Sequence, residues 1–166
     1  MQKPISTQDL AARMTAILSA PLVQGGDPAQ PNLTFHSALD SCDGPSLTVT
    51  YRVRTYRWMC NPNGVVHGGV AATMMDNHMG LLTRALTGNF TPTITMTVNY
   101  ARPIPLETEL LITAHAVTLG RTTAQLTAQL AEADAPDRVL VSACGVYHTA
   151  RSFQQAAAER AERSGG

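Results

Sequence analysis

The chain has 166 residues and a mass of 17.7 kDa, which fits one domain spanning residues 1–166 and excludes a large multidomain enzyme. Only 14% of the residues are charged, against roughly a quarter in ordinary soluble proteins. We therefore expect part of the surface to be buried against another copy of the chain. Twelve basic and twelve acidic residues give a net charge of zero, which argues against a nucleic-acid partner.

The sequence also lacks the patterns of a membrane span, a signal peptide, a disulfide framework or a metal site. The sequence has no run of 18 apolar residues, so it predicts no membrane span, and residues 1–20 lack the apolar core of a signal peptide. We expect a cytoplasmic protein. Cys42, Cys60 and Cys144 form no CxxC pair, and the histidines form no HExxH pattern. The sequence therefore predicts neither a disulfide framework nor a metal site.

The first third of the chain predicts a helix and two strands. Residues 7–19 have the spacing of an amphipathic helix, which Thr7 can cap and Pro21 ends. Residues 25–31 predict a loop, and residues 33–40 predict a strand. After a turn at residues 43–45, residues 47–58 alternate as a strand. The apolar face of that strand carries Leu47, Val49, Tyr51 and Val53, and its polar face carries Thr48, Thr50, Arg52 and Arg54.

A long apolar helix follows the turn at residues 61–64, which read NPNG. Residues 70–86 are rich in helix formers, contain no proline and are apolar on nearly every face, so we expect a helix buried all round. Between Met59 and Ala101 the only Asp, Glu, Lys or Arg residues are Asp76 and Arg84.

The rest of the chain predicts four strands, at residues 93–101, 106–119, 122–132 and 138–149. Short turns at residues 120–121 and 134–137 separate the last three, which favours an antiparallel sheet that wraps around the helix. Residues 152–166 predict a frayed helix. The fold class is therefore α+β with a central buried helix.

Asp76 is the informative residue of this helix. The residues one turn away are Ala72, Thr73, Met79 and Gly80. For an arbitrary helical aspartate a solvent-facing or structural role is the commoner one, because a buried charge is costly unless it is paired. Here the helix offers no polar face, which favours function: a carboxylate held among apolar groups can act as a general base.

His67, Gly68 and Gly69 stand where a loop enters the predicted helix. The first backbone N–H groups of a helix have no partner within it and lie at the positive end of its dipole, which suits a developing oxyanion. Taken alone, two glycines before a helix only permit a tight turn. Likewise, His67 or Asn61 alone is more typical of a structural or turn residue, and Thr93 of an ordinary strand residue.

Other notable side chains are expected to be structural. The remaining histidines form no constellation; they are His36, His78, His115 and His148. The helix methionines Met74, Met75 and Met79 are more typical of core packing than of a special motif.

Taken together, these residues resemble the signature of hotdog-fold acyl-CoA thioesterases. Residues 61–69 read NPNGVVHGG, and Asp76 follows nine residues after His67. This pattern is similar to the N-x-x-G-x-x-H-G-G motif of the phenylacetate-pathway and thioesterase superfamily member 2 branch of the 4-hydroxybenzoyl-CoA thioesterase-like superfamily. Residues 97–103 and 111–122 also resemble that branch. The likeness covers about residues 47–149 and implies a hotdog fold, in a dimer or a dimer of dimers.

The resemblance implies a role for each motif residue. Asp76 takes the place of the carboxylate that activates water or attacks the thioester, and the N–H of Gly68 takes the place of the donor to the thioester carbonyl. Asn61 and His67 match residues that line the reacting centre, and Thr93 falls where the family has a hydroxyl that helps to hold the water. In this family the two halves of the site come from different protomers.

The resemblance also implies an acyl-CoA or aryl-acyl-CoA substrate, cleaved to free acid and CoA without a cofactor. Arg102 and Arg121 are candidates for binding the CoA phosphates. The commoner interpretation of such residues is that they are scattered surface arginines without a binding role. Met74, Met75 and Met79 are expected to line the acyl pocket, and flexible methionines leave both aryl and fatty acyl groups open.

Two alternatives stay open from the sequence. One is a non-catalytic acyl-CoA-binding protein with the same fold. The presence of Asp76 after the two glycines disfavours a protein that only binds. The other is a hydratase or dehydratase acting on acyl thioesters. The spacing of six residues between Gly69 and Asp76 favours hydrolysis.

Overall fold

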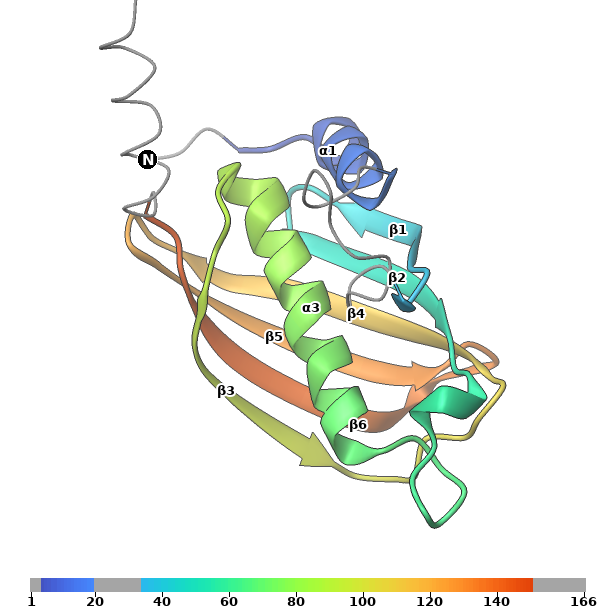
Figure 1. Cartoon of the computed structure of the whole chain (residues 1–166). Helices are drawn as coiled ribbons and strands as arrows, with labels where there is room; N and C mark the ends of the chain where they lie inside the picture. Colours follow the sequence, from blue (N-terminus) through green and yellow to red (C-terminus); the bar gives the residue numbers. More distant parts are fainter. Residues whose placement is uncertain (1–3, 20–33, 151–166) are drawn as a thin grey trace, which may run out of the picture.

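A computed structural model describes residues 4–19 and 34–150 of the chain. One long helix, α3 (Gly68–Thr87), lies across one face of an antiparallel sheet of six strands, as Figure 1 shows. The strand order is β1-β2-β4-β5-β6-β3. The strands are β1 (Ala38–Asp43), β2 (Thr48–Arg54), β3 (Thr93–Tyr100), β4 (Glu109–Leu119), β5 (Thr123–Glu132) and β6 (Ala135–His148). The predicted α+β class and antiparallel pairing are confirmed.

The core lies between α3 and the sheet. Alternate residues of β2, β4, β5 and β6 point toward the helix, as period-two patterning requires. Burying a large apolar side chain contributes about 1.5–3 kcal/mol relative to its exposure. The largest fully buried side chains on α3 and the sheet are Met74, Met75, Met79, Leu82, Tyr51, Leu110, Ile112 and Tyr147.

The long helix differs from its prediction in two respects. It begins at Gly68, two residues before the predicted start, because the side chain of His67 accepts a hydrogen bond from the N–H of Gly69 and caps it. The expectation that it is buried all round is wrong for the single chain. The helix lies on one face of an open sheet, so one stripe points away from the core. The partly or fully exposed residues of this stripe are Ala72, Thr73, Asp76, Asn77, Gly80 and Arg84.

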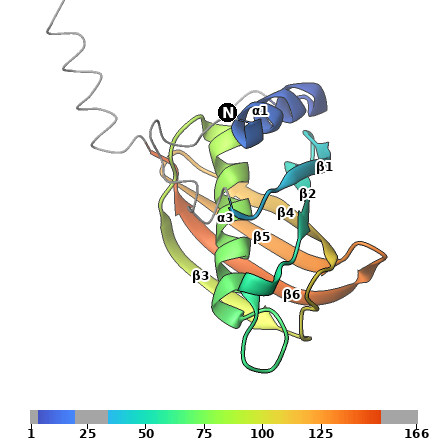
Figure 2. The same ribbon diagram turned by 45° about the vertical axis from the view of Figure 1, so that its right-hand side comes forward.

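The first helix, α1 (Thr7–Ser19), has the predicted bounds but not the predicted cap. Ser6, rather than Thr7, caps it: the Oγ of Ser6 accepts from the N–H of Asp9 at 3.0 Å and donates to the carboxylate of Asp9 at 2.7 Å. Thr7 instead accepts from the N–H of Gly44, in the β1–β2 turn. Figure 2 shows α1 beside β1 and the C-terminal end of α3. On this side α1 buries its residues Leu10 and Met14.

Four predicted strands have boundaries shifted by three residues or more, and one of them, expected at 106–119, begins at Glu109. The strand expected at residues 33–40 forms instead at Ala38–Asp43, because Phe35 packs into the core and His36 adopts a positive φ of 47°. The strand expected at 47–58 ends at Arg54 and is followed by a short 3-10 helix, Arg57–Met59. The last strand begins at Ala135, before Pro136, because a bulge opposite Ala131 and Glu132 accommodates the proline.

Two expectations lie outside the described residues, namely the loop at 25–31 and the frayed helix at 152–166. Within the described part of the chain, no helix is long and apolar enough to cross a bilayer. Cys42, Cys60 and Cys144 are free thiols, and residues 4–19 and 34–150 contain no group of three side chains placed to hold a metal ion.

Candidate active site

The loop before α3 is built around Asn61. The side-chain Oδ1 of Asn61 accepts from the N–H of Asn63 at 2.8 Å. The backbone N–H of Asn61 donates to the carbonyl of Val65 at 2.8 Å. The predicted turn is therefore confirmed, and its positive φ of 78° falls on Gly64. In the single chain the amide of Asn61 is engaged in holding the loop. That is the structural role that the residue type alone favours.

His67 and Gly68 together form the start of α3. The N–H of His67 donates to the carbonyl of Met59 at 2.8 Å, and its Nδ1 accepts from the N–H of Gly69 at 2.9 Å. Gly68 is the first helical residue, so its N–H has no acceptor within the helix. Its carbonyl accepts from the hydroxyl of Tyr100 at 2.9 Å, which ties the end of β3 to the start of α3.

A surface groove of about 350 Å³ lies beside Gly68, between the start of α3 and the end of β3. Arg102 lines it, and its Nη1 donates to the carbonyl of Val139 at 2.6 Å. The other lining residues are Val65, Val66, Ala71, Tyr100, Ala101, Pro103 and Ile104. The groove is therefore apolar at its base and has one cation at its rim.

Asp76 lies in the middle of α3, on the stripe that points away from the core, and it is half-buried. Thr93, the first residue of β3, donates from its Oγ1 to Oδ1 of Asp76 at 2.7 Å. The hydroxyl of Tyr147 on β6 donates to the same oxygen at 2.9 Å and lies 3.2 Å from the backbone carbonyl of Asp76. Thr93, which the resemblance implied would help to hold the water, therefore contacts Asp76 within one chain.

Tyr147 was not among the residues predicted from the sequence. Burial, followed by the neighbouring charge of Asp76, raises the pKa of its hydroxyl above the ordinary value, so the hydroxyl stays protonated as a donor. A signal was available. Tyr147 falls on the inward face of a predicted strand, and a buried tyrosine hydroxyl needs an acceptor. Asp76 was the carboxylate predicted on the facing helix.

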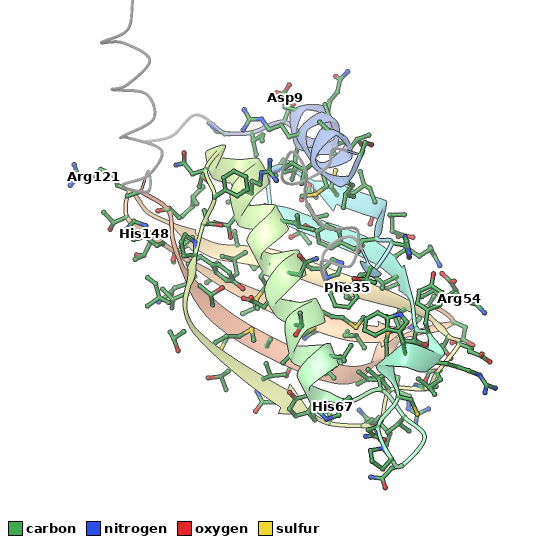
Figure 3. The ribbon with its side chains drawn as sticks, in the orientation of Figure 1. Asp9, Phe35, Arg54, His67, Arg121 and His148 are labelled. Atoms are coloured by element: carbon green, nitrogen blue, oxygen red, sulfur yellow. The ribbon has the colours of Figure 1, made fainter. Side chains whose placement is uncertain are left out.

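The predicted site residues lie in separate parts of the single chain. Eight residues of helix separate Gly68 from Asp76, which corresponds to about 12 Å along the axis. Figure 3 shows His67 at one end of α3, and Arg121 beside His148 at the opposite end of the sheet. Asn61, His67, Gly68 and Arg102 therefore belong to one end of the molecule. Arg121 lies far from them, in the turn between β4 and β5.

The three methionines of α3 do not form a pocket in the single chain. Met74, Met75 and Met79 are completely buried between the helix and the sheet and line none of the described cavities. That they line an acyl pocket stays a prediction, and in the single chain all three side chains pack against the sheet.

His78 has the structural role that was expected. Its Nδ1 lies 2.6 Å from the carbonyl of Met74 and its Nε2 lies 2.8 Å from the hydroxyl of Ser37. A carbonyl can only accept, so Nδ1 carries the proton. Burial lowers the pKa of His78 to about 4, and the ring is neutral at pH 7.

Comparisons with known proteins agree with this architecture. Residues 63–137 match the family model of the Thioesterase superfamily. No curated protein sequence matches the chain significantly.

Several solved structures match the chain. The PaaI protein of the E. coli phenylacetic acid degradation operon matches with a TM-score of 0.70 at 13% identity, over 87% of this chain and 96% of that chain. Zebrafish thioesterase superfamily member 2 matches with a TM-score of 0.67 at 18% identity, over 87% and 99%. A hypothetical thioesterase of Streptococcus pneumoniae, solved with coenzyme A, matches with a TM-score of 0.61 at 24% identity, over 70% and 91%. At these identities the likeness establishes the hotdog fold, and the predicted fold is confirmed.

Proposed function

We propose that this chain, which has the hotdog thioesterase fold and matches the Thioesterase superfamily over residues 63–137, hydrolyses acyl-CoA or aryl-acyl-CoA thioesters to the free acid and CoA. The observation that carries the proposal is the carboxylate of Asp76. It lies on the outward stripe of an otherwise apolar helix, and the hydroxyls of Thr93 and Tyr147 fix its position. A carboxylate held in this way is suited to reaction rather than to packing.

The chemistry requires a second group, a donor to the thioester carbonyl. The free N–H of Gly68 at the positive end of α3 is the candidate. It cannot serve the carboxylate of its own chain, because about 12 Å of helix separates the two residues. A complete site therefore needs the Gly68 of one chain beside the Asp76 of another.

The edge strand β3 offers a way to bring them together. It ends the sheet, carries no charged side chain, and leaves Ile94 and Tyr100 more than half exposed. Exposed edges of this kind pair readily with another strand. Asp76 contacts Thr93 at the start of β3, and Gly68 contacts Tyr100 at its end. Antiparallel pairing of two β3 strands about a two-fold axis would set the start of one beside the end of the other.

The reaction then needs no metal and no serine nucleophile. Asp76 takes a proton from water, whose oxygen bonds to the thioester carbon. The C–S bond breaks, and the thiolate of CoA takes up the proton. In the variant route the carboxylate attacks the carbon itself, CoA leaves, and water cleaves the resulting anhydride. A well-aimed donor such as the N–H of Gly68 contributes about 3 kcal/mol to such a step, and general-base assistance contributes about two to four powers of ten in rate.

Two features of the relatives support a CoA thioester as the substrate. The streptococcal thioesterase was solved with coenzyme A, and a second streptococcal relative was solved with acetyl-CoA. Further structures of the first protein carry alanine in place of one aspartate and of one threonine, and this chain pairs an aspartate, Asp76, with a threonine, Thr93. Arg102, at the rim of the groove beside Gly68, is the cation best placed for a CoA phosphate.

A thiol-release assay with phenylacetyl-CoA and medium-chain acyl-CoAs tests the proposal. Release of free CoA at rates proportional to enzyme concentration is the expected result. Saturable binding of the same compounds, measured by calorimetry, without release of CoA would instead identify a non-catalytic acyl-CoA-binding protein. Formation or loss of a double bond in the acyl group, with the thioester intact, would identify a hydratase or dehydratase.

A further inference from the structure

Tyr147 and Thr93 converge on the same oxygen of Asp76. The hydroxyl of Tyr147 lies 2.9 Å from Oδ1, and Oγ1 of Thr93 lies 2.7 Å from it. Both groups are donors, and hydrogen bonds to an ionised carboxylate are stronger than those to a neutral carbonyl. The proton of Tyr147 therefore goes to Oδ1 rather than to the backbone carbonyl 3.2 Å away.

The ring of Tyr147 is held in a slot formed by two glycines. A Cβ added at Gly80 of α3 would lie 3.8 Å from Cε1 of the ring, and one added at Gly145 of β6 would lie 3.0 Å from Cε2. Side chains larger than hydrogen would therefore touch or displace the ring. Only 1% of Tyr147 is exposed, so the direction of its hydroxyl is fixed by packing.

The two oxygens of Asp76 consequently differ. Oδ1 accepts two hydrogen bonds, whereas Oδ2 accepts none from the described part of the chain. The carboxylate cannot rotate without losing both donors. Its unpaired oxygen is therefore presented in one direction, away from β6.

We propose that Tyr147 is a positioning residue that, with Thr93, holds Oδ1 of Asp76 so that Oδ2 is the oxygen that reacts with water or with the thioester carbon. This inference rests on the proposed thioester hydrolysis and deepens it. The role of Tyr147 is exerted through its hydrogen bond to Asp76. It acts by fixing the carboxylate and by stabilising its charged form.

Tyr147→Phe tests the role, and the chain supplies a matched control. Tyr51 is equally buried, and its hydroxyl donates to the carbonyl of His78 on the same helix, at 3.1 Å, without contacting a carboxylate. We expect Tyr147→Phe to lower kcat about 10- to 100-fold with little change in KM, because a small misplacement of a reacting group has that effect. The acidic limb of the pH–rate profile is compared between the variant and the wild type.

Variants at Tyr51 and Thr93 distinguish a positioning role of Tyr147 from a general loss of stability. Tyr51→Phe should lower the unfolding midpoint in urea by a comparable amount, yet leave kcat and the acidic limb as in the wild type. At the exposed end of β3, Thr93→Val should reproduce the kinetic effect of Tyr147→Phe without its loss of stability, and Thr93→Ser should restore most of the rate. These Thr93 variants decide the question if Tyr147→Phe does not fold. If Tyr147→Phe and Thr93→Val both keep the wild-type kcat and acidic limb, the proposal is wrong.

A readout that does not depend on turnover separates this inference from the proposed function. The urea unfolding of Asp76→Ala, Tyr147→Phe and the double variant should be non-additive, because both single changes remove the same interaction. The corresponding set with Tyr51→Phe should be additive. Coupling without any thioester hydrolysis would mean that the carboxylate is held as described but the substrate class is wrong. Additivity in the Tyr147 set would overturn the positioning role whatever the activity.

Discussion

Gly68 and Asp76 occupy the same helix, yet about 12 Å of its axis separates the first residue from the second. Each is tied to a different end of β3, Gly68 through Tyr100 and Asp76 through Thr93. On the proposed mechanism, each chain carries both reacting groups, and two copies are needed to bring them together.

Gly68→Pro tests the donor role of one N–H. Proline is well tolerated at the first helical position, and His67 before it already has the extended conformation that proline requires, with ψ at 135°. We expect the variant to fold and to lose about 100-fold or more in kcat. Gly68→Ala is the matched control, since its Cβ would lie 3.7 Å from the ring of Tyr100 and its N–H is retained. A Gly68→Pro enzyme that is folded by circular dichroism and as active as Gly68→Ala would exclude the donor role.

His67 caps α3, and this role can be separated from any part in the reaction. His67→Ala should lower the free energy of unfolding by about 1 kcal/mol, because the N–H of Gly69 loses its acceptor. Asparagine is a good cap, so His67→Asn should keep the stability, as measured by urea unfolding. If the imidazole also acts in the reaction, both variants lose activity. An active His67→Asn enzyme would restrict the residue to capping.

His78 should make the protein less stable in mild acid. Its folded pKa of about 4 lies below the unfolded value of about 6.5, so the unfolded chain binds the proton first as the pH falls. The stability present above pH 6.5 is then lost progressively down to pH 4, by about 3 kcal/mol in total. We expect His78→Gln to be less stable at pH 7 but to show a shallower decline. Wild-type and variant curves of unfolding free energy that run parallel between pH 6.5 and pH 4 would contradict this.

The sequence could predict the elements of this fold because its apolar periodicities are strong. The bounds of α1, the presence of the long helix α3 and the alternation around Tyr51 follow from spacing and helix propensity. The boundaries that moved depend on tertiary contacts. Phe35 leaves the predicted strand to reach the core, and the bulge that accepts Pro136 exists only once β5 and β6 pair.

For the candidate site, Asp76 stood out as a carboxylate on an apolar helix and Gly68 as a glycine at a helix start, whereas Thr93 was implied only by the resemblance to hotdog thioesterases. The contact between Thr93 and Asp76 needed the fold, since it joins residues from a strand and a helix. Tyr147 lies 71 residues from Asp76 in sequence, and no local pattern joins them. The exposed stripe of α3 was missed because an apolar sequence does not reveal that a sheet covers only one side of a helix.

Complementation tests whether the site is shared between chains. Gly68→Pro and Asp76→Ala should each be almost inactive alone. When the two are unfolded and refolded together, about half of the dimers are mixed, and each mixed dimer has one intact site. The mixture should therefore recover up to about a quarter of the wild-type activity. If mixed dimers form, as seen by mass spectrometry, and the activity stays at the level of the parents, each site is built within one chain.

The most direct test of the central claim is the rate of CoA release by the wild type and by Asp76→Asn, measured on the same acyl-CoA at saturating concentration. Asparagine preserves the shape of the side chain and can still accept from Thr93 and Tyr147, but it can neither take a proton from water nor attack the thioester. The account predicts that the wild type releases CoA and that the variant, still folded and still binding the substrate, is slower by about 100-fold or more. An Asp76→Asn enzyme that hydrolyses the thioester within a few-fold of the wild-type rate would contradict it.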